Sequence, residues 1–166
     1  TVRNLYISST KNDQGLIGLL NTNGKVHDLT VTGSVITTGK DAAGIVGTAK
    51  TKTTIVNCLN RADVTAASSA AGVVGMADGM VSKAAAAKNA PVITGCGNTG
   101  TITATDEAGC AGGVASVASM FPARGGVMKD CFNVGTVTGA GKSGAVTNTT
   151  NKQKQADVGG NYFLAG

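Results

Sequence analysis

The sequence predicts an all-β protein, a right-handed parallel β-helix (β-solenoid) of about five coils with insertions at one edge. Two observations carry this prediction. A short pattern recurs along the whole chain at intervals in the solenoid range of roughly 20–50 residues. The composition is also rich in small residues, with 25 Gly, two Pro and no Trp among 166 residues. Small and β-branched side chains suit flat, narrow strand surfaces.

The first repeated element surrounds three cysteines. The segments "IVNCLNRADVT" (55–65), "ITGCGNTGTIT" (93–103) and "MKDCFNVGTVT" (128–138) have an apolar residue three before Cys and Asn two after it. An earlier copy, "VHDLTVTGSVI" (26–36), carries Leu29 at the Cys position. The start of the chain places Leu5 there, and the end places Tyr162 there.

Equivalent residues of a solenoid stack from coil to coil at roughly the 4.8 Å strand spacing. We therefore expect an inward ladder of Leu29, Cys58, Cys96 and Cys131. We expect a second ladder, at a turn, of Asn60, Asn98 and Asn133, with side-chain amides bonded from coil to coil as in cross-β stacks.

A second element follows each first one. It reads "GLIG" (15–18), "GIVG" (44–47) and "GVVG" (72–75), with degenerate copies "GVAS" (113–116) and "GAVT" (144–147). Glycine permits corners and close approach of one coil to the next. With two such elements in each repeat, we expect two or three short strands in every coil.

The paired elements resemble the GLUG-motif repeat family, and the resemblance extends over essentially the whole chain. It implies a β-helical stalk or display scaffold in a bacterial surface or secreted protein, with an extracellular or cell-surface location. The family has no agreed catalytic residues, so the resemblance assigns none. The two degenerate copies depart from its pattern, which indicates less regular last coils.

The 166 residues are expected to be a single β-solenoid domain (1–166), and a piece of a larger surface protein. The chain begins "TVRNLYI", which fits a fragment or mature segment. It lacks a run of 18 apolar residues, so membrane insertion is not expected. The net charge of +5 is mildly basic. It permits an acidic partner but does not indicate nucleic-acid binding.

Two glycine-rich stretches are similar to nucleotide-binding loops. "GCGNTG" (95–100) fits G-x-G-x-x-G, but a strand pattern follows it where the fingerprint requires a helix. "GTVTGAGKSG" (135–144) fails the P-loop pattern because its first glycine is one position too early. The repeat explains both stretches, and we expect no cofactor.

Metal binding and cysteine chemistry are not expected either. The four Cys include no C-x-x-C pair, and His27 is the only histidine. Buried free thiols are the favoured interpretation of the cysteine ladder, because stacked side chains point in parallel. A disulfide, including one between Cys110 and a ladder cysteine, stays the alternative.

Coil length varies after the Gly-x-x-Gly element, in the stretches 76–90, 117–125 and 148–157. Insertions at one repeat position emerge along one edge of a solenoid. A short helix is expected in "SKAAAAK" (82–88) because Ala and Lys favour helices. Basic residues gather in these stretches and predict an anion-binding edge for glycan or cell-wall polymer: Lys83, Lys88, Arg124, Lys152 and Lys154. The alternative is an ordinary solvated edge.

The sequence therefore predicts a non-catalytic structural or adhesion module that binds glycan or host protein through edge loops. Its acids are scattered, and the pair of facing carboxylates that glycoside hydrolysis requires is not evident. A carbohydrate-active β-helix enzyme, similar to polysaccharide lyases or hydrolases, is the alternative. Because no polar cap is evident at either end, end-to-end self-association is a further expectation.

Overall fold

All strand pairs in the structure are parallel, which accords with the predicted fold class. The computed structural model describes residues 1–77, 89–117, 127–147 and 157–164. Within these residues the chain is built from short strands that form four separate parallel sheets. None of the described residues lies in a helix that is long and apolar enough to cross a membrane.

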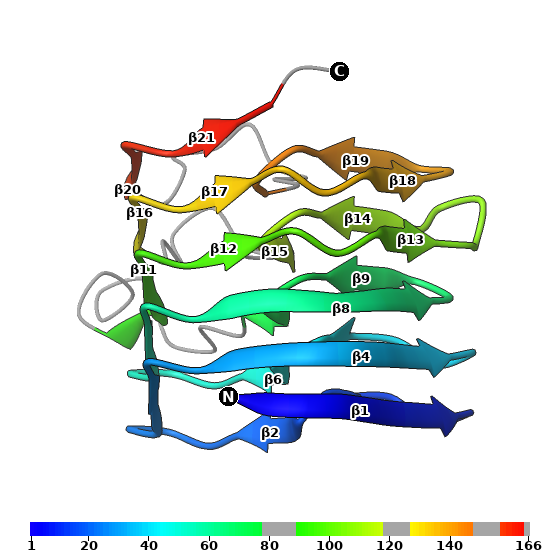
Figure 1. Cartoon of the computed structure of the whole chain (residues 1–166), viewed down its shortest axis with the longest axis horizontal. Helices are drawn as coiled ribbons and strands as arrows, with labels where there is room; N and C mark the ends of the chain where they lie inside the picture. Colours follow the sequence, from blue (N-terminus) through cyan, green and yellow to red (C-terminus); the bar gives the residue numbers. More distant parts are fainter. Residues whose placement is uncertain (78–88, 118–126, 148–156, 165–166) are drawn as a thin grey trace.

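The largest sheet, sheet A, has eight strands (Figure 1). Its main path runs through β1 (Val2–Ser9), β4 (Thr30–Thr37), β8 (Leu59–Ala66), β12 (Gly97–Asn98), β17 (Phe132–Asn133) and β21 (Tyr162–Phe163). The long strand β8 is followed in the next repeats by two short strands, so that β13 (Ile102–Ala104) pairs with β8 and β18 (Val137–Gly139) pairs with β13.

Three smaller sheets complete the structure. Sheet B contains β2 (Ile17–Leu20), β6 (Val46–Ala49), β10 (Val74–Ala77) and β15 (Ala115–Val117). Sheet C contains β3 (Lys25–His27), β7 (Thr54–Val56), β11 (Val92–Thr94), β16 (Val127–Lys129) and β20 (Asp157–Gly159). Sheet D contains β5 (Ala42–Ala43), β9 (Ser69–Ala71), β14 (Cys110–Gly112) and β19 (Lys142–Gly144).

The chain visits the sheets in the order A, D, B, C and then returns to A in the next repeat. Neighbours within a sheet are therefore equivalent strands of successive repeats, which lie above one another in Figure 1. The second repeat, β4 to β7, has four strands, so the expectation of two or three was too low. The Gly-x-x-Gly element does not form one strand, because its first two residues separate a sheet D strand from a sheet B strand.

The interior is filled by small and β-branched side chains. The largest fully buried side chains include Ile45, Ile55 and Ile102, and most of the others are valines. Alanine fills the narrow space between sheets A and D, where Ala42, Ala70 and Ala111 are fully buried. This packing explains how a chain with three Phe and no Trp encloses a core.

The register corrects three details of the predicted alignment. Leu5 pairs with Gly33 and not with Leu29, after an irregularity between Val2 and Leu5. Tyr162 pairs with Phe132, one residue beyond Cys131. In the last Gly-x-x-Gly copy, Gly144 pairs with Gly112 rather than with Gly113. All three errors fall in the terminal repeats, where the motif is degenerate.

The three stretches of variable length occupy one position in the repeat. Each connects a sheet B strand, or the equivalent bridge at Thr147, to the following sheet C strand. Most of their residues, including the helix expected in "SKAAAAK" (82–88), lie outside the described residues.

The first glycine of the Gly-x-x-Gly element lies directly beneath an asparagine of the following repeat. A Cβ built on Gly44 would lie 1.9 Å from Asn60 Oδ1. On Gly72 it would lie 2.5 Å from Asn98 Oδ1, and on Gly113 2.4 Å from Asn133 Cγ. Real Cβ atoms do not approach other atoms so closely, so each asparagine requires a glycine below it. The two sequence elements of the repeat are thus halves of one packing unit.

Gly72→Ala is expected to destabilise the protein by about 2 kcal/mol or more, because overpacking here displaces Asn98 and the backbone of Gly113. Gly97→Ala is the matched control. A Cβ on Gly97 would meet the ring of Phe132, which is 37% exposed and free to swing outward. Urea unfolding of both variants measures the difference, and equal losses would contradict the packing unit.

Candidate functional site

The three predicted ladder asparagines form a continuous chain of side-chain hydrogen bonds. Asn60 Nδ2 donates to Asn98 Oδ1 at 2.7 Å, and Asn98 Nδ2 donates to Asn133 Oδ1 at 2.7 Å. All three side chains are buried, with exposed fractions of 0%, 0% and 4%. Buried amides are tolerated only when their donors and acceptors are satisfied.

Each asparagine also closes a turn within its own repeat. Asn98 Nδ2 donates to Gly100 O at 2.9 Å, and Gly100 N donates back to Asn98 Oδ1 at 3.3 Å. Asn60 makes the same pair of bonds with Ala62, and Asn133 makes it with Gly135. The amide therefore fixes the turn that separates β12 from β13 and also joins successive repeats.

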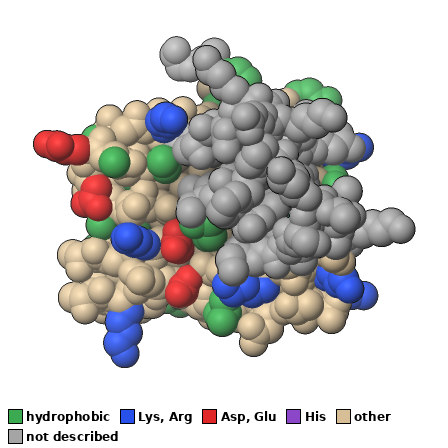
Figure 2. Space-filling model, turned by 180° about the vertical axis from the view of Figure 1, so that it is seen from behind, with side chains coloured by type: hydrophobic (Ala, Val, Ile, Leu, Met, Phe, Trp, Pro, Cys, Tyr) green, Lys and Arg blue, Asp and Glu red, His purple; other side chains and the backbone are tan. Residues whose placement is uncertain are grey.

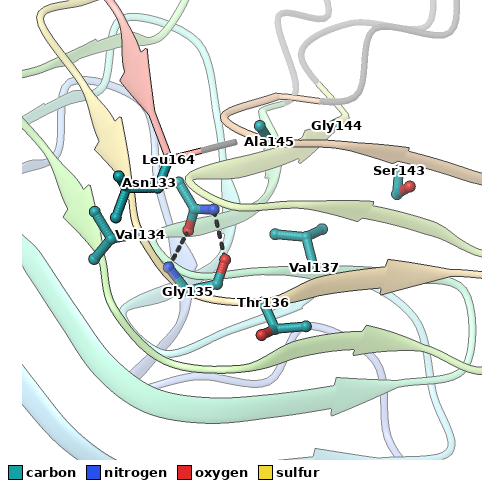
Figure 3. A pocket seen from close by; sticks show the side chains of 9 residues that line it. All are labelled: Asn133, Val134, Gly135, Thr136, Val137, Ser143, Gly144, Ala145 and Leu164. Atoms are coloured by element: carbon teal, nitrogen blue, oxygen red, sulfur yellow. Dashed lines mark hydrogen bonds between the residues drawn. The ribbon is translucent and has the colours of Figure 1, made fainter. Parts of the chain in front are cut away.

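The ladder ends at both sides of the described stack. Below the ladder, Val31 of the preceding repeat pairs with Asn60. Above it, Phe163 of the following repeat pairs with Asn133. In Figure 3 the Asn133 amide faces Gly135, and the structure shows its Nδ2 donating to Gly135 O at 2.8 Å. The next described asparagine, Asn161, accepts from Cys131 N and donates to Met128 O instead of joining the ladder, so Asn133 has no amide partner in the rung above it.

A cavity of about 390 Å³ lies beside this last rung. The residues around it come from the end of β17, from β18 and β19, and from the chain after β21 (Figure 3). Its lining includes Asn133, Gly135, Thr136, Val137, Ser143 and Leu164. The cavity borders the buried polar ladder at Asn133, and its lining combines apolar side chains with an amide and two hydroxyls.

The cysteine column is buried and its thiols are free. Cys58, Cys96 and Cys131 each place Sγ within 3.2–3.4 Å of the carbonyl oxygen two residues earlier, which accepts the thiol proton. Hydrogen bonding with the thiols of Cys131 and Cys58 is the main cause that raises the pKa of Cys96, and burial adds to this effect. Leu29, one repeat earlier, is half-buried against the same cluster. These residues act as small apolar side chains in the core.

Cys110 lies away from that column. It is in β14 of sheet D, where it pairs with Ser69 on one side and Lys142 on the other. All four cysteines are free thiols, so the structure does not contain the alternative disulfide.

The residue before each ladder cysteine, and the equivalent residue of the first and last corners, sits at a left-handed corner between sheets C and A. Asp28, Asn57, Gly95, Asp130 and Gly160 have φ between 52° and 63°. Only Gly, Asn and Asp adopt this conformation readily. The acids at this repeat position are therefore explained by backbone geometry. A hydrogen bond from the neighbouring His27 lowers the pKa of Asp28, and both side chains are exposed.

The structure brings together two acids that the sequence reasoning treated separately. Asp13 N donates to Lys40 O at 2.9 Å, so Asp13 lies beside Asp41 of the following repeat. Burial raises the pKa of Asp41, and the charge of Asp13 raises it further, whereas a hydrogen bond from Ser69 opposes the shift. The Asp13 carboxylate accepts a hydrogen bond from Thr48.

Acidic and basic side chains lie close together on the side of the molecule facing away from the viewer of Figure 1 (Figure 2). Lys40 and Lys50 both lower the pKa of Asp41, which opposes burial. The signal for this acid pair was available in the sequence, because Asp13 and Asp41 each precede a Gly-x-x-Gly element. Their distances from that element differ by one residue, which hid the match.

The residues of the predicted anion-binding edge all lie outside the described residues: Lys83, Lys88, Arg124, Lys152 and Lys154. Within the part that the structure describes, there is no group of three or more His, Cys, Asp or Glu side chains that could hold a metal ion. In "GCGNTG", Gly95 forms the left-handed corner, Gly97 lies in β12, and Gly100 lies in the turn that Asn98 closes before β13.

No family model, curated protein or solved structure matches the chain. Its function is therefore inferred from the geometry of the chain itself.

Asn98→Ala is expected to destabilise the protein by about 3 kcal/mol or more, because it leaves Asn60 Nδ2 and Asn133 Oδ1 without their ladder partner. Asn133→Ala removes a single ladder bond and is expected to cost less. Urea unfolding at equilibrium measures both free energies. A loss for Asn133→Ala that equals or exceeds that for Asn98→Ala would mean that the ladder is not cooperative.

Asp41→Asn is expected to stabilise the protein relative to wild type as pH rises. Because the pKa of Asp41 is raised in the folded protein, the native state keeps this proton to a higher pH than the unfolded chain does. Wild-type stability should therefore fall as pH rises above the ordinary value of 3.8, and the asparagine variant should lack this loss.

The measurement is the free energy of unfolding of both proteins from below pH 3.8 to neutral pH. Asn also tolerates the left-handed φ of 62° at this position, so the backbone is not strained. Asp106→Asn, at an exposed turn, is the matched control for replacing an aspartate by asparagine. A constant difference between Asp41→Asn and wild type would refute the burial of this charge.

Proposed function

We propose that this chain is a right-handed parallel β-helix that serves as a non-catalytic structural or adhesion module, a stalk or display scaffold, of a bacterial cell-surface or secreted protein. One observation carries the proposal. Equivalent strands of successive repeats pair in parallel in four sheets, and a buried asparagine ladder joins them. Such a stack repeats the same arrangement of strands along one axis.

The side chains that recur from repeat to repeat all have structural partners. Asparagines bond to asparagines, glycines lie beneath them, cysteines fill the core, and Asp or Asn forms corners. In repeat proteins of this kind, stability is approximately the sum of each unit and its contacts with its neighbours. Because the recurring side chains are engaged in stacking, the pattern favours a scaffold, as the resemblance to the GLUG-motif family also suggests.

Adhesion is the proposed contribution of the connections between sheets B and C. These stretches hold the five basic residues of the predicted edge, and glycans or cell-wall polymers often carry negative charge. The partners we propose are therefore acidic glycans, with a protein on the host or cell surface as the other candidate. Extracellular location at the bacterial surface is part of the same proposal.

Retention on heparin or teichoic-acid resin at low and high salt tests the adhesive edge. We expect retention at low salt that falls as salt rises, because exposed charges are screened. Replacing Lys83, Lys88, Arg124, Lys152 and Lys154 by Gln should abolish it. The matched control replaces five other basic residues, Arg3, Lys11, Lys25, Lys40 and Arg61, all exposed, and should be retained. Binding that is absent or independent of salt rejects the edge.

A carbohydrate-active enzyme is the second candidate, because Asp13 lies beside Asp41 in neighbouring repeats and glycoside hydrolysis uses two carboxyl groups. Burial raises the pKa of Asp41, as is typical of a general acid. The structural proposal predicts that wild type releases no reducing ends from a panel of acidic and neutral polysaccharides. Release that Asp13→Asn and Asp41→Asn both abolish would establish the enzyme instead.

A further inference from the structure

We propose that the outer face of sheet A binds a neutral polysaccharide, one of whose sugar rings stacks on the exposed aromatic ring of Phe132. This inference rests on the proposed adhesive function and adds a binding site to it. The site lies on sheet A, whereas the basic edge lies on the connections between sheets B and C. Five side chains form the site, which we call the Phe132 platform: Leu59, Arg61, Thr99, Phe132 and Val134.

The aromatic side chains lie on the surface of sheet A and not in the core. The chain has two Tyr and three Phe, and none of those that the structure describes is buried. Tyr6, Phe132 and Tyr162 all point outward from sheet A, because the residues beside them in β1 and β17 point inward. Aromatic residues usually supply much of a core, and they are enriched where surfaces contact a partner. Their placement here therefore indicates a binding face.

Two outward columns of sheet A form the platform, and the sheet faces the viewer in Figure 1. Successive side chains of a strand point to opposite faces, so the residues on either side of each buried ladder asparagine point outward. They are Leu59, Gly97 and Phe132 before the asparagines, and Arg61, Thr99 and Val134 after them. Arg61 and Thr99 are exposed although repeats lie on both sides of them, so this face is open independently of where the stack ends.

The Phe132 ring lies flat on the backbone of Gly97. A Cβ built on Gly97 would lie 2.2 Å from Cζ, 2.3 Å from Cε1 and 2.8 Å from Cε2 of this ring. Such similar distances to three neighbouring ring atoms mean that the ring turns its face to Gly97, and not its edge. Gly97 is buried beneath the ring, whereas Phe132 itself is 37% exposed. One face of the ring is therefore held against the sheet, and the other faces solvent.

A ring held in this way is suited to stacking on a sugar. The face of an aromatic ring carries partial negative charge, whereas the axial C–H groups of a pyranose carry partial positive charge and form an apolar face. Because the backbone of Gly97 already supports the Phe132 ring, binding orders few additional groups. Leu59 and Val134 extend the apolar surface on either side of the ring.

The polar side chains beside the platform match the hydroxyl groups of a neutral sugar. Arg61 only donates hydrogen bonds, an ionised Asp63 only accepts them, and the Thr99 hydroxyl does both. Arg61 and Asp63 are two residues apart in β8 and point to the same side, so their charges offset each other. Asp63 Oδ1 accepts from Thr101 N at 2.8 Å, which holds the carboxylate on this face.

The mixed charge favours a neutral sugar over other ligands. Single-stranded nucleic acid also stacks on aromatic rings, but it requires a basic groove. Here Asp63 follows Arg61 on the same face, and Asp130 lies two residues before Phe132. A protein interface of standard size has about 20–30 residues on each side. The apolar surface of the platform has three side chains, which is the scale of one or two sugar rings.

Electrophoresis in native gels that contain a soluble neutral polysaccharide tests the site, with xyloglucan, galactomannan, glucomannan and laminarin as the probes. Wild type is expected to be retarded by at least one of them. Phe132→Ala should bind that polysaccharide roughly tenfold more weakly or worse, as is typical when a stacking ring is removed. Phe132→Tyr keeps the ring and should be retarded. Tyr6→Ala, exposed on the same face in the first repeat, is the matched control and should migrate like wild type.

Two further variants separate stacking from a purely structural role of Phe132 in covering Gly97. Phe132→Leu still covers the glycine with an apolar side chain but has no ring, so it should fold and lose the retardation. Gly97→Ala keeps the ring but displaces it from the backbone, and it should weaken the retardation. Urea unfolding of both variants verifies that they are folded.

Three results would overturn the site. They are migration of wild type that no polysaccharide changes, retardation that persists in folded Phe132→Leu, and self-association of wild type in sedimentation velocity that Phe132→Leu abolishes. The last result would assign the platform to a second copy of the chain.

Retention on heparin distinguishes failure of this site from failure of the proposed adhesive edge. Retention on heparin at low salt without retardation by a neutral polysaccharide would reject the Phe132 platform alone. Retardation that depends on Phe132, without retention on heparin, would reject the basic edge alone.

Discussion

The structure depends on one interaction, the seating of a buried asparagine on the glycine of the repeat below. The Asn98 side-chain amide makes four hydrogen bonds: one with Asn60, one with Asn133 and two with Gly100. This arrangement leaves no space for a side chain at Gly72. Since an unpaired buried amide is costly, the register of sheet A is fixed wherever the ladder is present.

The same constraint explains where the first glycine is lost. Gly15 lies below Val31 and is required for a different reason, because a Cβ there would lie 2.7 Å from the backbone oxygen of Ala43. In the last described repeat, the place of Gly113 is taken by Ala145, above which Phe163 follows instead of asparagine. In this repeat the first glycine is replaced where no asparagine lies above it, whereas Gly113 keeps its place beneath Asn133 even though its copy of the motif is degenerate.

The columns that could be predicted from the sequence are those built from the repeated motif. Aligning the segments around Cys58, Cys96 and Cys131 placed both the cysteines and the asparagines, because each position has a single residue type. The number of strands could not be predicted, because the break between sheets D and B has no proline or turn signature. Leu5 was misplaced by four residues and Tyr162 by one, since a terminal repeat is aligned by one neighbour only. The pairing of Asp13 with Asp41 was missed for a related reason, an irregular residue count before the first Gly-x-x-Gly element.

The hydrogen bonds of the asparagine ladder all run in one sense. Each Nδ2 donates to the Oδ1 of the next repeat, so the carboxamide dipoles of Asn60, Asn98 and Asn133 align instead of cancelling. The column is therefore a vector, with an acceptor face toward the N-terminus and a donor face toward the C-terminus. A column of this kind distinguishes its two ends chemically even though every rung is the same residue, and it gives the whole stack a polarity that no single repeat has.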